Sequence, residues 1–135
     1  TAHPVIGLDT NVIVRYLAQD DPAQSARATR LIERELDERE PGYVSLIVLV
    51  ETCWVLRRLY GATATELRDT VRDLLDARQL AVENRVVVAR ALTRAVADGV
   101  DIADALIAEG AAHAGCARTV TFDKAAVKAG MMLLR

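Results

Sequence analysis

The stretch Val5-Ile6-Gly7-Leu8-Asp9-Thr10-Asn11 decides the fold of this 135-residue chain. Its apolar residues predict a buried strand over 5–9, and the apolar positions that follow, at helical spacing, predict a helix over 10–17. The strand ends on Asp9, just where the helix begins. A carboxylate in this position is common in α/β proteins, so its meaning depends on whether other acids converge on it.

The alternation of strand and helix continues along the whole chain. We expect further strands near 43–45, 80–82, 118–122 and 131–134, and helices over 22–37, 46–59, 64–75, 85–97, 102–114 and after residue 123. Parallel neighbouring strands need such crossover helices, and ligands then bind beyond the carboxyl ends of the strands. The sequence therefore predicts one α/β domain over 1–135, a three-layer α/β/α sandwich with a central, mostly parallel sheet of four or five strands.

The composition suits a single folded domain without a membrane span. With 52% hydrophobic residues the chain can bury a core without disulfides, and its longest apolar run, 46–50, is far shorter than the roughly 18 residues of a membrane span. The N-terminus lacks the pattern of a secretory signal. Cys53 and Cys116 lie in apolar surroundings without metal-type spacing, which favours reduced core thiols in a cytoplasmic protein over a disulfide.

The charge balance argues against a broadly basic nucleic-acid-binding surface, because the net charge is −2 and the pI is about 5.7. All but two of the 17 basic residues are arginine, whose planar guanidinium suits phosphate and carboxylate groups.

Of four acids that the pattern singles out, three have an ordinary structural interpretation when each is taken alone. Asp9 and Asp123 can cap helices, and Asp104 can be a first-turn acid favoured by the helix dipole. Glu51 differs, because apolar residues precede and follow it, so an ionised carboxylate there needs a partner.

Taken together, the four acids predict a cation site. Carboxylates that lie close together raise one another's pKa unless a cation neutralises them. A set of oxygen ligands favours Mg²⁺ or Mn²⁺ over zinc, and such an ion can activate water for attack on a phosphodiester.

The sequence resembles the PIN-domain ribonucleases, and most of all their VapC toxin branch. The resemblance rests on the segments Leu8-Asp9-Thr10-Asn11, Asp101-Ile102-Ala103-Asp104-Ala105-Leu106-Ile107-Ala108 and Thr121-Phe122-Asp123, with Glu51 inside an apolar helix. It runs from about Val5 to Leu134 in the order and spacing of the family. It implies an acidic pocket that binds Mg²⁺ or Mn²⁺ and RNA cleavage that leaves 5′-phosphate and 3′-hydroxyl ends.

The resemblance also implies roles for individual residues. Asp9, Glu51 and Asp104 match the core acids, and Asp123 matches a more variable fourth acid. Asp101 matches a possible auxiliary acid. Asn11 and Thr121 match polar residues that orient the acids, and Arg15 and Arg58 are candidate RNA contacts.

The partners implied by the resemblance are RNA, an antitoxin of the VapB type that covers the active-site groove, and a second copy of the chain. Tyr16, Val44, Leu46 and Trp54 can line such a groove or dimer surface, or belong to the core. The expected function is a toxin ribonuclease that inhibits translation. A housekeeping RNA-processing nuclease and a catalytically silent PIN-like binding module stay open as alternatives.

Other enzyme classes fit the sequence less well. A haloacid-dehalogenase-type phosphatase needs a second acid at the position of Asn11, and a receiver domain needs paired acids after the first strand. A histidine-dependent ribonuclease needs an acid and base pair, whereas His3 lies near the terminus and His113 near a helix end, where we expect it to pack.

Overall fold

A computed structural model describes residues 6–135 and confirms the α/β class. Strands β1 (Ile6–Gly7), β2 (Gly42–Val44) and β3 (Leu80–Val82) form a parallel sheet in the order β1-β2-β3. The expected strand residue Val5 and the terminal His3 lie outside the described residues. Since the three strands are parallel, their carboxyl ends share one edge, which is where Asp9 lies.

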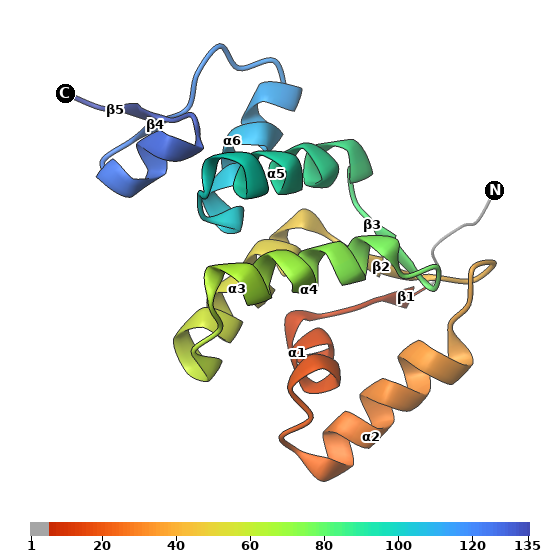
Figure 1. Ribbon diagram of the computed structural model, residues 1–135. Helices are drawn as coiled ribbons and strands as arrows, with labels where there is room; N and C mark the ends of the chain where they lie inside the picture. Colours follow the sequence, from red (N-terminus) through yellow and green to blue (C-terminus); the bar gives the residue numbers. More distant parts are fainter. Residues whose placement is uncertain (1–5) are drawn as a thin grey trace.

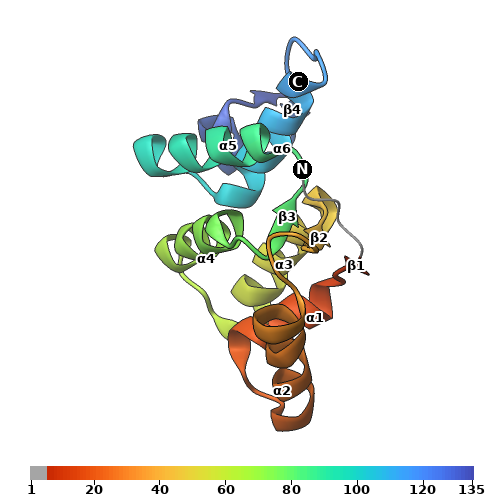
Figure 2. The same cartoon turned by 90° about the vertical axis from the view of Figure 1, so that its right-hand side faces the viewer.

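The helices form three successive pairs beside this sheet (Figures 1 and 2). Helices α1 and α2 lie at one end of the molecule, α3 and α4 in the middle, and α5 and α6 at the other end. Their bounds are Thr10–Ala18 for α1, Pro22–Arg30 for α2, Leu46–Tyr60 for α3, Ala64–Asp76 for α4, Arg85–Asp98 for α5 and Ile102–His113 for α6. Helix α2 continues as a π-helical turn, η1 (Leu31–Glu35), which ends close to the predicted position.

The last two strands, β4 (Val120–Thr121) and β5 (Met132–Leu133), form a separate parallel sheet connected by the 3₁₀ helix η2 (Lys124–Ala129). The prediction of four or five strands in one sheet is therefore wrong. The C-terminal segment packs beside α5 and α6 instead of beside β1: Arg94 of α5 donates to the carbonyl of Ala129 at 2.9 Å and pairs with Glu109 of α6 at 3.1 Å. These contacts hold η2 against α5 and α6, and Figure 1 shows β4 and β5 far from β1.

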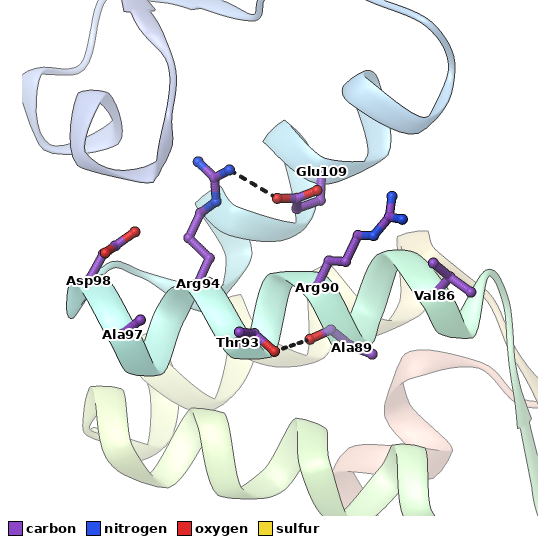
Figure 3. Close-up of a pocket in the computed structure, with 8 residues that line it drawn as sticks. All are labelled: Val86, Ala89, Arg90, Thr93, Arg94, Ala97, Asp98 and Glu109. Atoms are coloured by element: carbon purple, nitrogen blue, oxygen red, sulfur yellow. Dashed lines mark hydrogen bonds and ion pairs between the residues drawn. The ribbon is translucent and has the colours of Figure 1, made fainter.

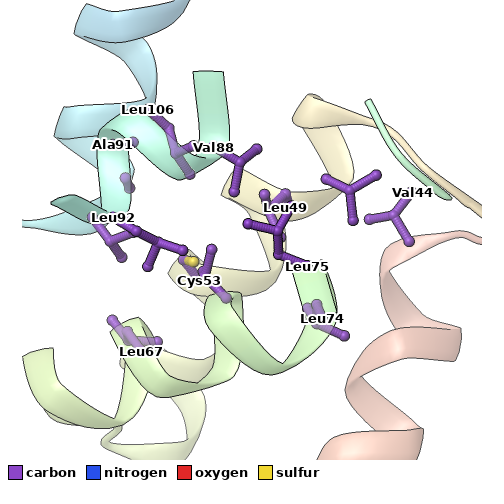
Figure 4. Packing of buried hydrophobic residues seen from close by; sticks show 14 of the residues in the cluster. Val44, Leu49, Cys53, Leu67, Leu74, Leu75, Val88, Ala91, Leu92 and Leu106 are labelled. Carbon is purple, nitrogen blue, oxygen red and sulfur yellow. The ribbon is translucent and has the colours of Figure 1, made fainter. Parts of the chain in front are cut away.

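The core lies between the middle helices, the sheet and the α5–α6 pair. Figure 4 shows Leu49 and Cys53 of α3 facing Leu75 of α4 and Val88 of α5. Helix α4 buries an apolar stripe formed by Leu67, Val71, Leu74 and Leu75. It begins with a capping box, in which Thr63 and Glu66 exchange hydrogen bonds of 2.9 and 3.1 Å between side chain and backbone.

Two predictions about burial are wrong. Helix α3 was expected to be mostly buried, yet Ile47 is 79% exposed and Leu59 is 75% exposed, because only one side of the helix packs on the core. Cys116 was expected to be a core thiol, but it follows the end of α6 and is exposed. Cys53 is buried as predicted, and burial raises the pKa of its thiol to about 12. Neither cysteine forms a disulfide.

Two helices begin without a side-chain cap. Asn84 and Asp101 occupy the N-cap positions of α5 and α6, but neither side chain bonds to the helix backbone. Asn84 has a positive φ of 50°, and the Asp101 carboxylate binds Arg57 instead. Within residues 6–135, none of the helices combines the length and the apolar character that a membrane crossing requires.

Candidate active site

Asp9 and Glu51 are linked through Thr10 at the carboxyl end of β1. Asp9 caps helix α1, since its Oδ1 accepts a hydrogen bond of 2.8 Å from the backbone N–H of Thr10. The buried Thr10 hydroxyl donates to the carboxylate of Glu51 on α3. Glu51 is exposed rather than enclosed by apolar residues, so the expectation that it lacks water is wrong. Its neighbours in sequence pack on the core, and its own side chain points outward.

These residues open onto a cavity of about 320 Å³, the α1–α3 cavity, lined by Asp9, Thr10, Asn11, Val14, Arg15, Glu51, Val55, Leu59 and Tyr60. Arg15 is held at its edge by Gln24 at 2.8 Å and by Asp20 at 3.3 Å, and Tyr60 donates to Asp20 at 2.5 Å. The guanidinium group of Arg15 is therefore engaged by partners within the protein, and its predicted contact with RNA stays a prediction. Among the described residues, no hydrogen bond joins Asn11 to either acid.

The other predicted acids gather around the start of α6. Asp101, Asp104 and Asp123 line a second cavity of about 320 Å³ with Arg57 and Arg58. We call it the α6 cavity; Trp54 and Ala125 complete its lining. Arg57 forms an ion pair with Asp101.

Asp123 is positioned by its own neighbours. It caps η2, since its Oδ1 accepts from the Ala125 N–H at 2.9 Å, and the Asp123 N–H donates to the Thr121 hydroxyl at 3.0 Å. Thr121 thus contacts the segment that carries this acid, as an orienting residue would. Its role in a reaction stays a prediction.

Asp104 has the clearest electrostatic signature of a functional acid. Burial raises the pKa of its carboxyl, the negative charges of Asp101 and Asp123 raise it further, and Arg57 lowers it. An acid that is half-buried beside two other acids holds its negative charge at a cost, and a bound cation reduces that cost.

We expect Arg57→Ala to raise the pKa of Asp104 further, because the variant removes the positive charge that favours the ionised form. NMR titration of the Asp104 carboxyl carbon measures this shift. Arg58→Ala is the matched control, since Arg58 lines the same cavity but is not among the charges that shift this pKa. An equal shift in both variants would contradict the assignment.

The structure does not bring the four predicted acids to one point. Asp9 and Glu51 lie at the α1–α3 cavity, and Asp104 and Asp123 lie at the α6 cavity. Within residues 6–135, no group of three or more metal-binding side chains is placed to hold one ion. The oxygen donors of the α6 cavity suit Mg²⁺ or Mn²⁺ chemically, but this arrangement does not fit a site made by all four acids.

An apolar groove of about 390 Å³ lies between the two acidic cavities, along α3 and α6. Its lining shares Glu51 with the α1–α3 cavity and Trp54 with the α6 cavity. The remaining residues of this apolar groove are Leu46, Ile47, Val50, Leu106, Ile107, Gly110 and Ala111. Of the residues predicted to line a groove, Leu46 and Trp54 do so, whereas Val44 is fully buried in the sheet and Tyr16 donates to Glu33 at 2.8 Å.

A larger cavity, of about 650 Å³, lies on the far side of α5 (Figure 3). None of the predicted site residues lines it, and Figure 3 shows its Arg94 paired with Glu109. The volume of a cavity therefore does not identify the site, because the cavity beside α5 contains none of the predicted acids.

Comparison with known protein families matches residues 6–130 to the PIN domain. The chain belongs to the PIN domain family. Members of this family are generally metal-dependent nucleases, which agrees with the predicted class of enzyme. A search of curated proteins found no match to the chain. The family assignment does not extend to the VapC branch, so the toxin role of this PIN domain is a proposal.

Sequence reasoning missed two residues of this PIN domain's site, Thr10 and Arg57. Thr10 follows Asp9 directly, but only the structure shows that its hydroxyl reaches across to Glu51. Arg57 precedes Arg58, which was predicted as an RNA contact. Helical spacing alone does not show that Arg57 is the arginine that pairs with Asp101 at the start of α6. His113 was expected to pack, but this is wrong: it lies exposed at the end of α6 and outside both acidic cavities.

Proposed function

We propose that this PIN domain is a Mg²⁺- or Mn²⁺-dependent endoribonuclease that acts as the toxin of a toxin–antitoxin pair. The observation that supports the proposal best is the α6 cavity, where Asp104 lies with two other acids and two arginines. A phosphodiester substrate needs both features, because guanidinium groups bind the phosphate and carboxylates handle the protons of the attacking water.

The protein's own groups suit hydrolysis at this cavity. Asp104 has a raised pKa, so its carboxylate is a better proton acceptor than an ordinary aspartate. Arg58 is exposed and can meet a phosphate, whereas Arg57 is engaged by Asp101. Asp9 and Glu51 supply a second acidic group at the other end of the apolar groove.

The experiment that tests the proposal is brief expression in a bacterial cell followed by sequencing of RNA 5′ ends. We expect growth arrest and new 5′-phosphate ends at defined positions. Purified protein should cleave RNA with Mg²⁺ or Mn²⁺ and lose the activity in EDTA. Cleavage without growth arrest would favour a housekeeping RNA-processing nuclease, and absence of both would favour a silent binding module.

The proposed partners are a VapB-type antitoxin and a second copy of the chain. We expect the product of the neighbouring gene to relieve the growth arrest and to inhibit cleavage when it is added to the purified enzyme. Light scattering of the purified protein should give twice the 14.7 kDa mass of one chain. A monomer that cleaves RNA would contradict the dimer but not the nuclease.

A further inference from the structure

One face of the small sheet formed by β4 and β5 is apolar and uncovered. Val120 pairs with Met132 in parallel register, so their side chains lie on the same face of the sheet. Phe122 and Leu134 are the next residues on this face, and the ladder reaches them, because the Leu134 N–H donates to the carbonyl of Thr121 at 2.8 Å. The four apolar side chains are between 48% and 81% exposed. We call this surface the outer face of the small sheet.

The opposite face of the small sheet is covered by the chain itself. Helix η2 is the main neighbour of both strands. The residues that alternate with the outer face are sheltered, since Thr121 and Leu133 are half-buried and Met131 is buried. Figure 1 shows β4 and β5 at one end of the molecule. Parallel sheets almost always have both faces covered, usually by helices, so a parallel sheet with one bare face indicates a missing cover.

The segment that carries the outer face is basic. Residues 118–135 contain a single acid, Asp123, and four basic residues, so their net charge is +3, whereas that of the whole chain is −2. The basic residues are Arg118, Lys124, Lys128 and Arg135. All four are exposed, and among residues 6–135 none of them takes part in an ion pair. Unpaired charges of one sign beside an apolar surface favour a partner of the opposite sign.

We propose that the outer face of the small sheet is a docking site for an acidic amphipathic helix of another protein. A helix is the usual cover of a parallel sheet, and its diameter of about 10 Å is close to the width of a pair of strands. Its apolar side chains pack on Phe122 and its neighbours, and its acids meet the basic residues around them. The acidic cavities and the apolar groove are lined by other residues, so this surface is separate from the proposed active site and does not depend on the proposed nuclease.

Two other occupants fit this surface less well. A second copy that packs by the same face brings together two segments of net charge +3, and like charges across an interface are unfavourable. A membrane surface with anionic lipids also attracts basic residues. Proteins that lie on such a surface typically bury the apolar side of an amphipathic helix in it, whereas the outer face is built on two strands of two residues each.

The test uses two synthetic peptides of about 18 residues, long enough to form a helix. One peptide has leucine on one side of the helix and glutamate on the other, and its twin has lysine in place of glutamate. Fluorescence anisotropy of each labelled peptide measures its binding to the whole chain at low ionic strength. We expect the acidic peptide to bind at least roughly 10-fold more tightly than its basic twin. Equal binding of the two peptides, or no binding of either, would overturn the proposal.

Phe122→Ala should weaken binding of the acidic peptide roughly 10-fold, because Phe122 is the most exposed side chain of the outer face. Val96→Ala is the matched control. Val96 is 55% exposed on α5, outside the small sheet, so its truncation should leave the affinity unchanged. In the wild-type protein, NMR should show that the peptide shifts the backbone amide signals of residues 118–135. Wild-type affinity in Phe122→Ala would contradict the assignment of the outer face.

Reversal of the charges tests the electrostatic part of the proposal. Lys124→Glu combined with Lys128→Glu should remove the preference for the acidic peptide over its basic twin. The control is Arg30→Glu combined with Arg34→Glu, which makes the same change in net charge at the same spacing on exposed residues of α2 and η1 and should keep the preference. The same loss of preference in both double variants would overturn the proposal, because net charge alone would then decide the binding.

Phe122→Ala also identifies the other possible covers of the outer face. Wild-type thermal stability together with weaker peptide binding supports the proposal. A large fall in Tm would overturn it, because the chain itself would then cover this face. A wild-type dimer that becomes a monomer in this variant would identify a second copy as the cover. Binding to phosphatidylserine vesicles that is lost in the variant, without binding of the acidic peptide to the wild type, would identify a membrane.

Discussion

Asp104→Asn is expected to reduce RNA cleavage at least about 100-fold, the lower range for loss of a group that handles protons in the transition state. Asparagine keeps the shape of the side chain but can neither accept a proton as a carboxylate nor attract a cation. The measurement is the rate of cleavage of a labelled single-stranded RNA in Mg²⁺ and in Mn²⁺. The control is Asp98→Asn, at the exposed end of α5 outside both acidic cavities, which should keep wild-type activity.

The same substitution should raise the thermal stability of the protein at neutral pH. Burial and the charges of Asp101 and Asp123 raise the pKa of Asp104 in the folded state. Ionised Asp104 therefore destabilises the fold as the pH rises from the unfolded value through the folded pKa. Asparagine removes this effect, so the gain in Tm should be present at pH 7 and vanish below the ordinary value of 3.8. An inactive variant with a lower Tm would indicate damage to the fold instead.

Leu49→Ala is expected to have the largest effect on stability. Leu49 is 1% exposed and lies in the centre of the core shown in Figure 4. Truncation of a buried leucine leaves a cavity and costs roughly 2–5 kcal/mol. For a domain of this size that is a fall in Tm of roughly 10 °C. Chemical denaturation at 25 °C measures the free energy of unfolding directly.

Ile47→Ala is the matched control for this prediction. Ile47 lies two residues earlier on the same helix and is 79% exposed, so its truncation should change the free energy of unfolding by less than about 0.5 kcal/mol. Equal losses in the two variants would contradict the orientation of α3.

Local signals in the sequence predicted the helices and strands well. The helix over 64–75 and the strand over 80–82 depend on residues close in the chain, and the structure has both close to the expected bounds. The acids at strand ends and helix starts were found for the same reason: Asp9 and Asp123 follow β1 and β4, and Asp104 lies in the first turn of α6.

Long-range contacts decided what the sequence did not predict. The run from Leu46 to Leu59 has apolar residues on all sides of the helix, so no periodicity shows that Glu51 and Trp54 face outward. Strands β4 and β5 lie in a separate sheet beside α5 and α6, where Arg94 contacts Glu109 and Ala129 and so joins three segments that are distant in the chain.

The small sheet of β4 and β5 is expected to be less stable against local opening than the main core. A ladder of two-residue strands and one 3₁₀ helix buries little surface, so this unit can open without unfolding α3 or α5. Its backbone amides should exchange with solvent hydrogen long before those around Val88, at the centre of the core. Asp123 lies in this small unit, whereas Asp104 lies on α6, which packs into the main core, so we expect the two acids to differ in how readily their backbone opens.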